Sequence, residues 1–290
     1  MPESTIERPA SASGTFALGG QLVVHRLGFG AMRLTGPGIW GAPADRDECI
    51  QVLRRAVELG VDLIDTADSY GPHVSEELIR AALHPYPEQL VIATKAGLVR
   101  TGPDRWHPVG RPEYLRQECE MSLRRLSLEQ LPLLQLHRVD PRIPLEDQVG
   151  ELRTLQQEGK VRFIGLSNVS PDQLRQARAI ASIVSVQNRY NLLDRQAEDV
   201  LQICERDRLG FIPWFPVATG QLARREGPLV SIAERLGVAP VQLALAWLLH
   251  RSPVMLPIPG TASVAHLEEN VEAALVGLTD DQFVQLSKLA

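Results

Sequence analysis

The sequence predicts an α/β protein with a closed (β/α)8 barrel, also called a TIM barrel. Eight short apolar runs alternate with eight helical patterns along the 290 residues. Repeated strand–helix units predict a parallel sheet, and eight units in a chain of this length match a closed barrel. A glycine pair, Gly19-Gly20, also separates two apolar runs at 15–18 and 21–24. This pattern predicts a β-hairpin, which we place across the floor of the barrel.

Each expected strand is a short apolar run, and each expected helix has apolar residues at helical spacing. Proline or glycine marks most joins between them, as is usual for loops between regular elements. The expected strands are residues 26–30, 61–65, 90–95, 131–137, 161–166, 183–187, 211–214 and 254–258. The expected helices are residues 45–59, 74–83, 112–126, 145–158, 171–180, 195–207, 229–250, 264–274 and 280–289, with a break near 237–240 in the seventh.

A doubly wound parallel sheet is the alternative fold. Its fingerprint, G-x-G-x-x-G after the first strand, places a dinucleotide at a helix N-terminus. The chain supplies Gly28 and Gly30 but has Arg33 in place of the third glycine, so we interpret this segment as a tight strand end. No linker-like stretch divides the chain, which predicts one domain over residues 14–290. Residues 1–13 are polar and contain two prolines, and we expect them to form a disordered tail.

The composition narrows the class of protein and partner. A net charge of −5 provides no electrostatic basis for binding nucleic acid or an anionic membrane. No run is long and apolar enough to span a bilayer, and the N-terminus lacks the apolar stretch of a signal peptide. Cys49, Cys119 and Cys204 lie far apart, which predicts reduced packing residues in a cytoplasmic protein. The oligomeric state is left open, with a monomer favoured.

Four polar residues stand where the expected strands end, which is where barrel enzymes carry their catalytic groups. The second strand ends in Asp65, with Tyr70 in the loop after it, the third ends in Lys95 and the fourth in His137. Lys95 is one of only three lysines among 30 basic residues, so a surface role explains it poorly. A buried lysine needs a partner, and Asp65 on the neighbouring strand is the expected one. The alternatives are a structural ion pair and a core histidine.

These residue types predict a site that protonates oxygen. A nearby ammonium lowers the pKa of a phenol, which lets Tyr70 donate a proton to a developing alkoxide. A neutral His137 can orient the carbonyl oxygen by a hydrogen bond. The sequence contains no metal-ligand spacing and no G-x-S-x-G nucleophile motif. The chemistry therefore needs a hydride donor, which implies a nicotinamide cofactor.

From about residue 15 onward, the chain resembles the aldo-keto reductases. The segment Asp65-Thr66-Ala67-x-x-Tyr70-Gly71, with Lys95 and His137, is similar to the Asp/Tyr/Lys/His tetrad of that family. The resemblance implies an enzyme that reduces a carbonyl compound with NADPH, and it implies that these four residues are catalytic.

The resemblance also implies a cofactor site. Ser167, Asn168 and Gln187 match positions that bind the nicotinamide carboxamide, and Trp214 matches a ring that stacks on the nicotinamide and is usually tyrosine. Many relatives have Arg or Lys near Ala262 for the 2′-phosphate, so NADH stays open beside NADPH. The other positions in matching segments are Phe215, Pro216, Gly260, Thr261, Ser263, His266, Glu269 and Asn270.

Within the family, scattered segments such as residues 34–38 and 70–74 resemble bacterial pyridoxal reductases (pyridoxine 4-dehydrogenases). This implies pyridoxal as the substrate, in a pocket walled by Met32, Trp40 and Trp106. Two other functions remain open. One is a broad carbonyl reductase for xenobiotic or sugar aldehydes, and the other is a regulatory subunit that binds nicotinamide without turnover.

Overall fold

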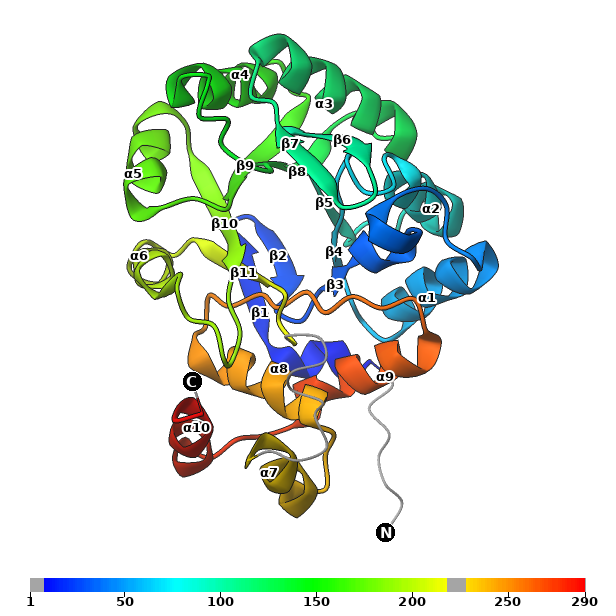
Figure 1. Cartoon of the computed structure of the whole chain (residues 1–290), viewed down its shortest axis with the longest axis vertical. Helices are drawn as coiled ribbons and strands as arrows, with labels where there is room; N and C mark the ends of the chain where they lie inside the picture. Colours follow the sequence, from blue (N-terminus) through cyan, green and yellow to red (C-terminus); the bar gives the residue numbers. More distant parts are fainter. Residues whose placement is uncertain (1–7, 218–227, 290) are drawn as a thin grey trace.

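The computed structural model describes residues 8–217 and 228–289. Within them, seven parallel strands form one curved sheet in the order β11-β10-β9-β8-β5-β4-β3, and helices cover its outer side (Figure 1). The strands are β3 (Phe29–Gly30), β4 (Leu63–Asp65), β5 (Val91–Ala96), β8 (Leu131–Leu136), β9 (Val161–Ser167), β10 (Ile183–Arg189) and β11 (Gly210–Trp214).

Residues 254–259 close the barrel between β11 and β3. Leu256 N donates to Phe211 O in β11 at 2.8 Å, and on the other side Gly28 N donates to Pro257 O at 3.0 Å. The segment forms one isolated bridge to β11, between Phe211 and Met255. On the β3 side, Pro257 and Pro259 accept through their carbonyls but have no N–H to donate, so no ladder is completed there. The predicted (β/α)8 barrel is confirmed, and the doubly wound alternative is wrong.

The predicted hairpin is present and lies in the middle of the ring of strands in Figure 1. Its strands, β1 (Thr15–Leu18) and β2 (Leu22–His25), pair antiparallel. Leu18 and Val24 are fully buried among inward-facing strand residues such as Leu63 and Ile212. Gly19 has a φ of +59°, and a Cβ there would lie 2.5 Å from the ring of Phe163. The hairpin therefore fills the barrel floor and leaves the opposite end for a site.

The helices alternate with the strands as predicted, and the seventh helical region is broken as expected. Proline begins several of them, where its missing N–H costs nothing. Cys49, Cys119 and Cys204 are free and buried on three of these helices. The helices are α1 (Arg46–Glu58), α2 (Val74–Leu83), α3 (Pro112–Leu126), α4 (Leu145–Gln157), α5 (Pro171–Ile180), α6 (Glu198–Asp207), α7 (Pro228–Leu236), α8 (Pro240–Arg251), α9 (Val264–Glu272) and α10 (Asp280–Ser287).

Two segments differ from the expectation. Residues 1–7 of the expected tail lie outside the described residues, but Pro9–Ser13 form the 3-10 helix η1. Ala10 there is fully buried, and its N–H donates to Leu59 O at 3.1 Å, so the tail is shorter than predicted. A second hairpin, β6 (Leu98–Gly102) and β7 (Arg105–Pro108), follows β5 and was not expected. Short 3-10 turns complete the fold: η2 (Ala31–Leu34), η3 (Pro37–Ile39) and η4 (Ala273–Leu275).

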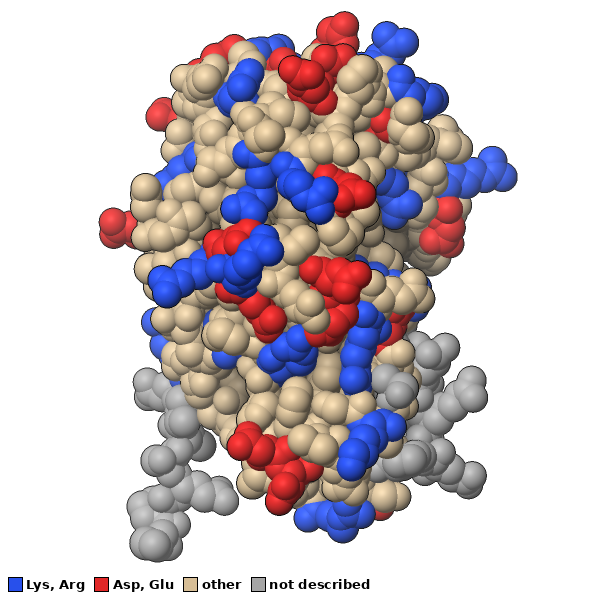
Figure 2. Space-filling model, turned by 90° about the vertical axis from the view of Figure 1, so that its left-hand side faces the viewer, with Lys and Arg blue, Asp and Glu red and all other residues tan. Residues whose placement is uncertain are grey.

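The surface carries both signs of charge. On the face shown in Figure 2, basic and acidic side chains are interspersed. In the part of the chain that the structure describes, no single helix has the length and apolarity needed to cross a membrane. Only α7 and α8 together meet that test, and they are bent by 93°.

Candidate active site

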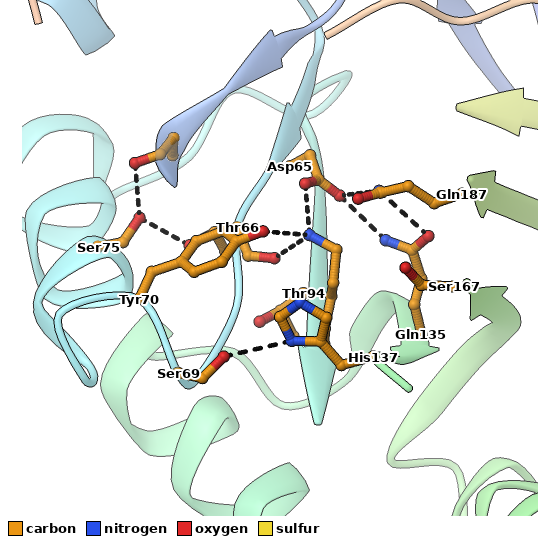
Figure 3. A network of polar contacts seen from close by, with 12 residues as sticks. Asp65, Thr66, Ser69, Tyr70, Ser75, Thr94, Gln135, His137, Ser167 and Gln187 are labelled. Atoms are coloured by element: carbon orange, nitrogen blue, oxygen red, sulfur yellow. Dashed lines mark hydrogen bonds and ion pairs between the residues drawn. The ribbon is translucent and has the colours of Figure 1, made fainter. Parts of the chain in front are cut away.

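Lys95 is fully buried in a polar cluster, and Figure 3 shows its partners Asp65, Thr66 and Tyr70 close together. Its Nζ donates to Asp65 Oδ1 at 2.5 Å, to Thr66 O at 2.9 Å and to the Tyr70 hydroxyl at 3.2 Å. An ammonium has three N–H groups, so every donor of Lys95 is used. Asp65 pairs in register with Ala93, and Lys95 two residues further on faces the same side of the sheet. The alternation of strand residues therefore brings the acid and the amine together.

Asp65 is held by two further side chains from distant strands. Gln135 on β8 and Gln187 on β10 each donate an amide hydrogen to Asp65 Oδ2, at 3.0 Å and 2.8 Å. With Lys95 on Oδ1, both oxygens of this buried carboxylate have partners, as a buried charge requires. Sequence reasoning assigned Gln187 to a cofactor site and missed Gln135. A glutamine in an otherwise apolar strand was the available signal for Gln135.

The loop that carries Tyr70 is tied to β5 by its backbone. Thr66 N donates to Ala93 O at 2.8 Å, and Asp68 N donates to Lys95 O at 3.2 Å. Burial raises the pKa of Tyr70, and the positive charge of Lys95 opposes this without cancelling it. The pKa of Tyr70 therefore lies above its ordinary value, which corrects the sequence-based expectation of a lowered one.

His137 completes the cluster from the end of β8. Its ring lies 5.7 Å from that of Tyr70 at 82°, and Nδ1 lies 3.2 Å from the Ser69 hydroxyl. Burial, followed by the charge of Lys95 and of nearby arginines, holds the pKa of His137 well below its ordinary value. The ring is therefore neutral at pH 7. Burial alone lowers the pKa of Lys95, but Asp65 and Tyr70 raise it by more, which keeps the amine charged.

The cluster opens into a cavity of about 380 Å³. Met32 and Trp106 line it, as predicted. Trp40 does not line it, because this half-exposed indole lies behind Arg100, 5.8 Å from its guanidinium. Residues on the wall that sequence reasoning did not assign include Arg33, Leu98, Pro108, Arg138 and Val217.

On one side of the cavity, three predicted cofactor residues form a hydrogen-bonded chain. Asn168, with a φ of +57°, donates from Nδ2 to Ser167 Oγ at 2.8 Å and accepts from Trp214 Nε1 at 3.0 Å. These contacts fix the indole of Trp214 at the cavity wall. Gln187, Phe215, Pro216 and Gly260 line the same cavity.

The remaining predicted cofactor residues follow Gly260 in the segment that leads into α9 and in α9 itself, outside the cavity lining. Gly260 packs closely on β3, and a Cβ there would lie 2.3 Å from Gly30 O. Ser263 is the N-cap of α9 without a side-chain cap bond, so the first N–H groups of this nine-residue helix remain available. Thr261 precedes the cap. On α9 itself, His266 is exposed, Glu269 is half-buried and Asn270 is buried.

A metal-dependent site is not suggested by the geometry. Within residues 8–217 and 228–289, no group of three His, Cys, Asp or Glu side chains could hold a metal ion. The chemistry available at the cavity is that of a phenol, an ammonium, a carboxylate and a neutral imidazole.

Comparison with known proteins agrees with this arrangement. Residues 26–290 match the profile described as "Aldo/keto reductase family". The chain is 52% identical over 279 residues to an uncharacterized oxidoreductase of Schizosaccharomyces pombe, spanning 96% of this chain and 90% of the relative. It is 44% identical over 276 residues to pyridoxine 4-dehydrogenase of Escherichia coli, and the match spans 93% of this chain and 96% of the relative. An aldo/keto reductase of Klebsiella pneumoniae, solved with NADP and acetate, matches with a TM-score of 0.79 at 29% identity over 95% of this chain and 94% of that one. Because the match spans nearly the whole barrel, including the strands that carry the buried cluster, this chain belongs to the aldo/keto reductase family.

Proposed function

We propose that this protein reduces an aldehyde or ketone to an alcohol with NADPH, and that Tyr70 supplies the proton. The observation that carries the proposal is the position of Lys95 Nζ, which bonds both Asp65 and the Tyr70 hydroxyl at the cavity wall. A raised pKa keeps the phenol protonated at pH 7, as a proton donor requires. Asp65 balances the charge of Lys95 and holds it in place.

The proposed cofactor is NADPH, with NADH as the alternative. When bound, it supplies the hydride. Ser167, Asn168 and Gln187 would hold the carboxamide, and Trp214 would lie flat against the nicotinamide ring. Gly260 is placed at the cavity edge by its close packing on β3, where any side chain would collide with Gly30 O. The uncapped N-terminus of α9 favours a phosphate, because its free N–H groups and helix dipole attract an anion. The relative solved with NADP supports this assignment.

The residues of this chain act on the carbonyl oxygen. With the Ser69 hydroxyl donating to Nδ1 of His137, the hydrogen of the neutral ring lies on Nε2, where it can donate to that oxygen. Tyr70 gives its proton as negative charge develops on the oxygen. Lys95 stabilises the phenolate that remains, and solvent restores the proton between turnovers.

Pyridoxal is the substrate we favour. It is a flat heteroaromatic aldehyde, and the cavity offers a flat wall in Trp106 beside apolar surface from Met32, Leu98 and Pro108. The relative named pyridoxine 4-dehydrogenase supports the same class. A broad carbonyl reductase is the second candidate, favoured by the largely apolar residues of that wall, which do not select for particular polar groups.

The test is NADPH oxidation with pyridoxal, measured for the wild type and for Tyr70→Phe. We expect steady turnover by the wild type and a loss of about 10²–10⁴-fold in the variant, with cofactor affinity unchanged. Turnover of simple aldehydes in preference to pyridoxal would identify a broad carbonyl reductase. Cofactor binding without oxidation on a panel of aldehydes would contradict the enzyme and favour a regulatory subunit.

A further inference from the structure

A buried arginine beside the active site, Arg100 on β6, donates all of its hydrogen bonds to backbone oxygens. It is 7% exposed. Among the described residues no carboxylate lies within ion-pair distance of it, and Asp104 acts on it only through longer-range charge. A guanidinium has five N–H donors, and each of the five contacts found here ends on a carbonyl oxygen. Nε donates to Arg105 O at 3.1 Å, Nη1 to Ile39 O at 2.6 Å and Ser69 O at 3.1 Å, and Nη2 to Gly38 O at 2.7 Å and Gly102 O at 3.3 Å.

These carbonyls belong to three separate loops around the cavity mouth. Gly38 and Ile39 lie in the turn η3, and Ser69 precedes Tyr70. The other two carbonyls belong to Gly102 and Arg105, which flank the turn of the β6–β7 hairpin. Arg100 therefore joins three loops that are far apart in the sequence. Because all of its donors are used, it has none left to bind an anionic group on a substrate.

The same guanidinium lies against the aromatic wall of the cavity. Its Cζ is 3.5 Å from the ring centre of Trp106. The Trp106 ring in turn stands nearly perpendicular to Tyr70, at 86° and 6.3 Å, and lies 6.3 Å from His137 at 67°. Stacking on one side and ring contacts on the other define the position of Trp106.

We propose that Arg100 is a positioning residue that holds Trp106 as the aromatic wall and thereby makes the enzyme select aldehydes on a flat ring over short aliphatic ones. This inference rests on the proposed reductase function. A ring pressed against a fixed indole gains an interaction that a short alkyl chain does not. Such contacts correspond to a preference of up to about tenfold.

Two substitutions separate the geometry of the guanidinium from its charge. Arg100→Lys keeps the positive charge but has three donors and no plane to stack, so it cannot join the loops or support Trp106. Arg100→Ala removes the positive charge and the planar donor group together, and it leaves room for a free guanidinium ion. Arg105→Ala is the matched control, because its side chain is exposed in the same hairpin and its carbonyl is retained.

The experiment measures kcat and KM for benzaldehyde and for propanal at saturating NADPH, with cofactor affinity and melting temperature as checks on the fold. For Arg100→Lys we expect the ratio of kcat/KM values, benzaldehyde over propanal, to fall about tenfold, mainly through the KM for benzaldehyde. Millimolar guanidinium, but not methylammonium, should restore the ratio in Arg100→Ala. Arg105→Ala should keep the wild-type ratio.

The outcomes distinguish this inference from the proposed function. If the wild type oxidises NADPH with neither aldehyde nor with pyridoxal, the proposed function is wrong. Two results with an active wild type would contradict the positioning role of Arg100. In the first, both Arg100 variants keep the wild-type ratio of kcat/KM values for benzaldehyde over propanal. In the second, they lose activity equally on both aldehydes. Rescue by methylammonium as well as guanidinium would show a charge effect and would also overturn it.

Discussion

The ammonium of Lys95 lies 3.2 Å from the hydroxyl of Tyr70, yet the pKa of Tyr70 is raised. Burial destabilises the phenolate by more than the neighbouring charge stabilises it. Lys95 therefore limits the rise in pKa, and the phenol remains protonated under neutral conditions. This relationship sets the expected pH dependence of the reaction.

We expect the rate of carbonyl reduction to be nearly constant through neutral pH and to fall only above the range in which an ordinary phenol ionises, because the pKa of Tyr70 is raised. His137 adds no ionisation near 6.5, because its pKa is held well below that value. Oxidation of the alcohol needs the phenolate as base, so its rate should rise with pH. Profiles of kcat with deuterated cofactor, which report whether hydride transfer limits the rate, would check this. A change in the rate of carbonyl reduction near pH 6.5 would contradict a neutral His137.

Lys95→Met should lower activity and move the alkaline limb of the reduction profile to higher pH. The reason is that the substitution removes the charge that opposes the burial of the phenolate. It also leaves the Asp65 carboxylate without its ion-pair partner, which destabilises the fold by about 3–5 kcal/mol. The double variant Asp65→Asn/Lys95→Met is the control, because it keeps the net charge of the pair and should recover stability without recovering activity.

Lys95 should not form an imine with the substrate. All three of its donors are used, and a charged amine cannot attack a carbonyl. Borohydride treatment with pyridoxal, followed by mass spectrometry, should find no adduct at Lys95 that forms at the rate of turnover. Surface labelling at Lys160 or Lys288 would serve as the internal control for reagent activity. An adduct at Lys95 with turnover kinetics would replace the proposed mechanism.

Ala262→Arg should tighten NADPH more than NADH. Ala262 is exposed just before α9 and offers no cation for a 2′-phosphate. A new guanidinium there would contribute a charge-assisted hydrogen bond worth about 1.5–3 kcal/mol at most. Cofactor fluorescence titrations of wild type, Ala262→Arg and Ala262→Gln would check it, with glutamine separating size from charge. An unchanged ratio of NADPH and NADH affinities would place the phosphate elsewhere.

Asp68→Asn should stabilise the protein, and more so at pH 8 than at pH 4.5. Burial, together with Glu76 and Glu118, raises the pKa of Asp68 well above its ordinary value. Both of its buried oxygens lack a hydrogen-bond partner within the described residues. Because the folded protein binds this proton more tightly than the unfolded chain, stability falls as pH rises from about 4 through the folded-state pKa.

The asparagine has no such charge to bury, so its advantage should grow over the same range to about 1–3 kcal/mol. Thermal unfolding of both proteins across pH measures it. Asp172→Asn, at an exposed position on α5, should show no comparable pH-dependent gain. An equal effect of Asp68→Asn at both pH values would mean that the carboxylate has partners in solution.

The sequence by itself determined the barrel and predicted that Asp65, Lys95 and His137 lie together at one end of it. Apolar runs with helical patterns between them predict parallel strands, and the C-terminal ends of parallel strands meet at one end of a barrel. A polar residue at such an end therefore has a predictable location without any knowledge of its contacts. The expected strand at residues 254–258 forms no ladder. Its proline, Pro257, is visible in the sequence, but the effect of that residue depends on which neighbouring strand it faces.

The tertiary structure alone decided the direction of the pKa shift of Tyr70 and the choice of side chains that line the cavity. Whether burial or Lys95 controls the pKa of Tyr70 depends on how tightly the surrounding loops exclude water. The choice of Trp106 over Trp40 as a cavity wall depends on an unexpected hairpin and on Arg100. Arg100 could not be recognised beforehand because all of its hydrogen-bond acceptors are backbone carbonyls, which every residue has. Contacts of this kind leave no pattern in a sequence, since they are specified by how distant loops pack and not by which side chains those loops carry.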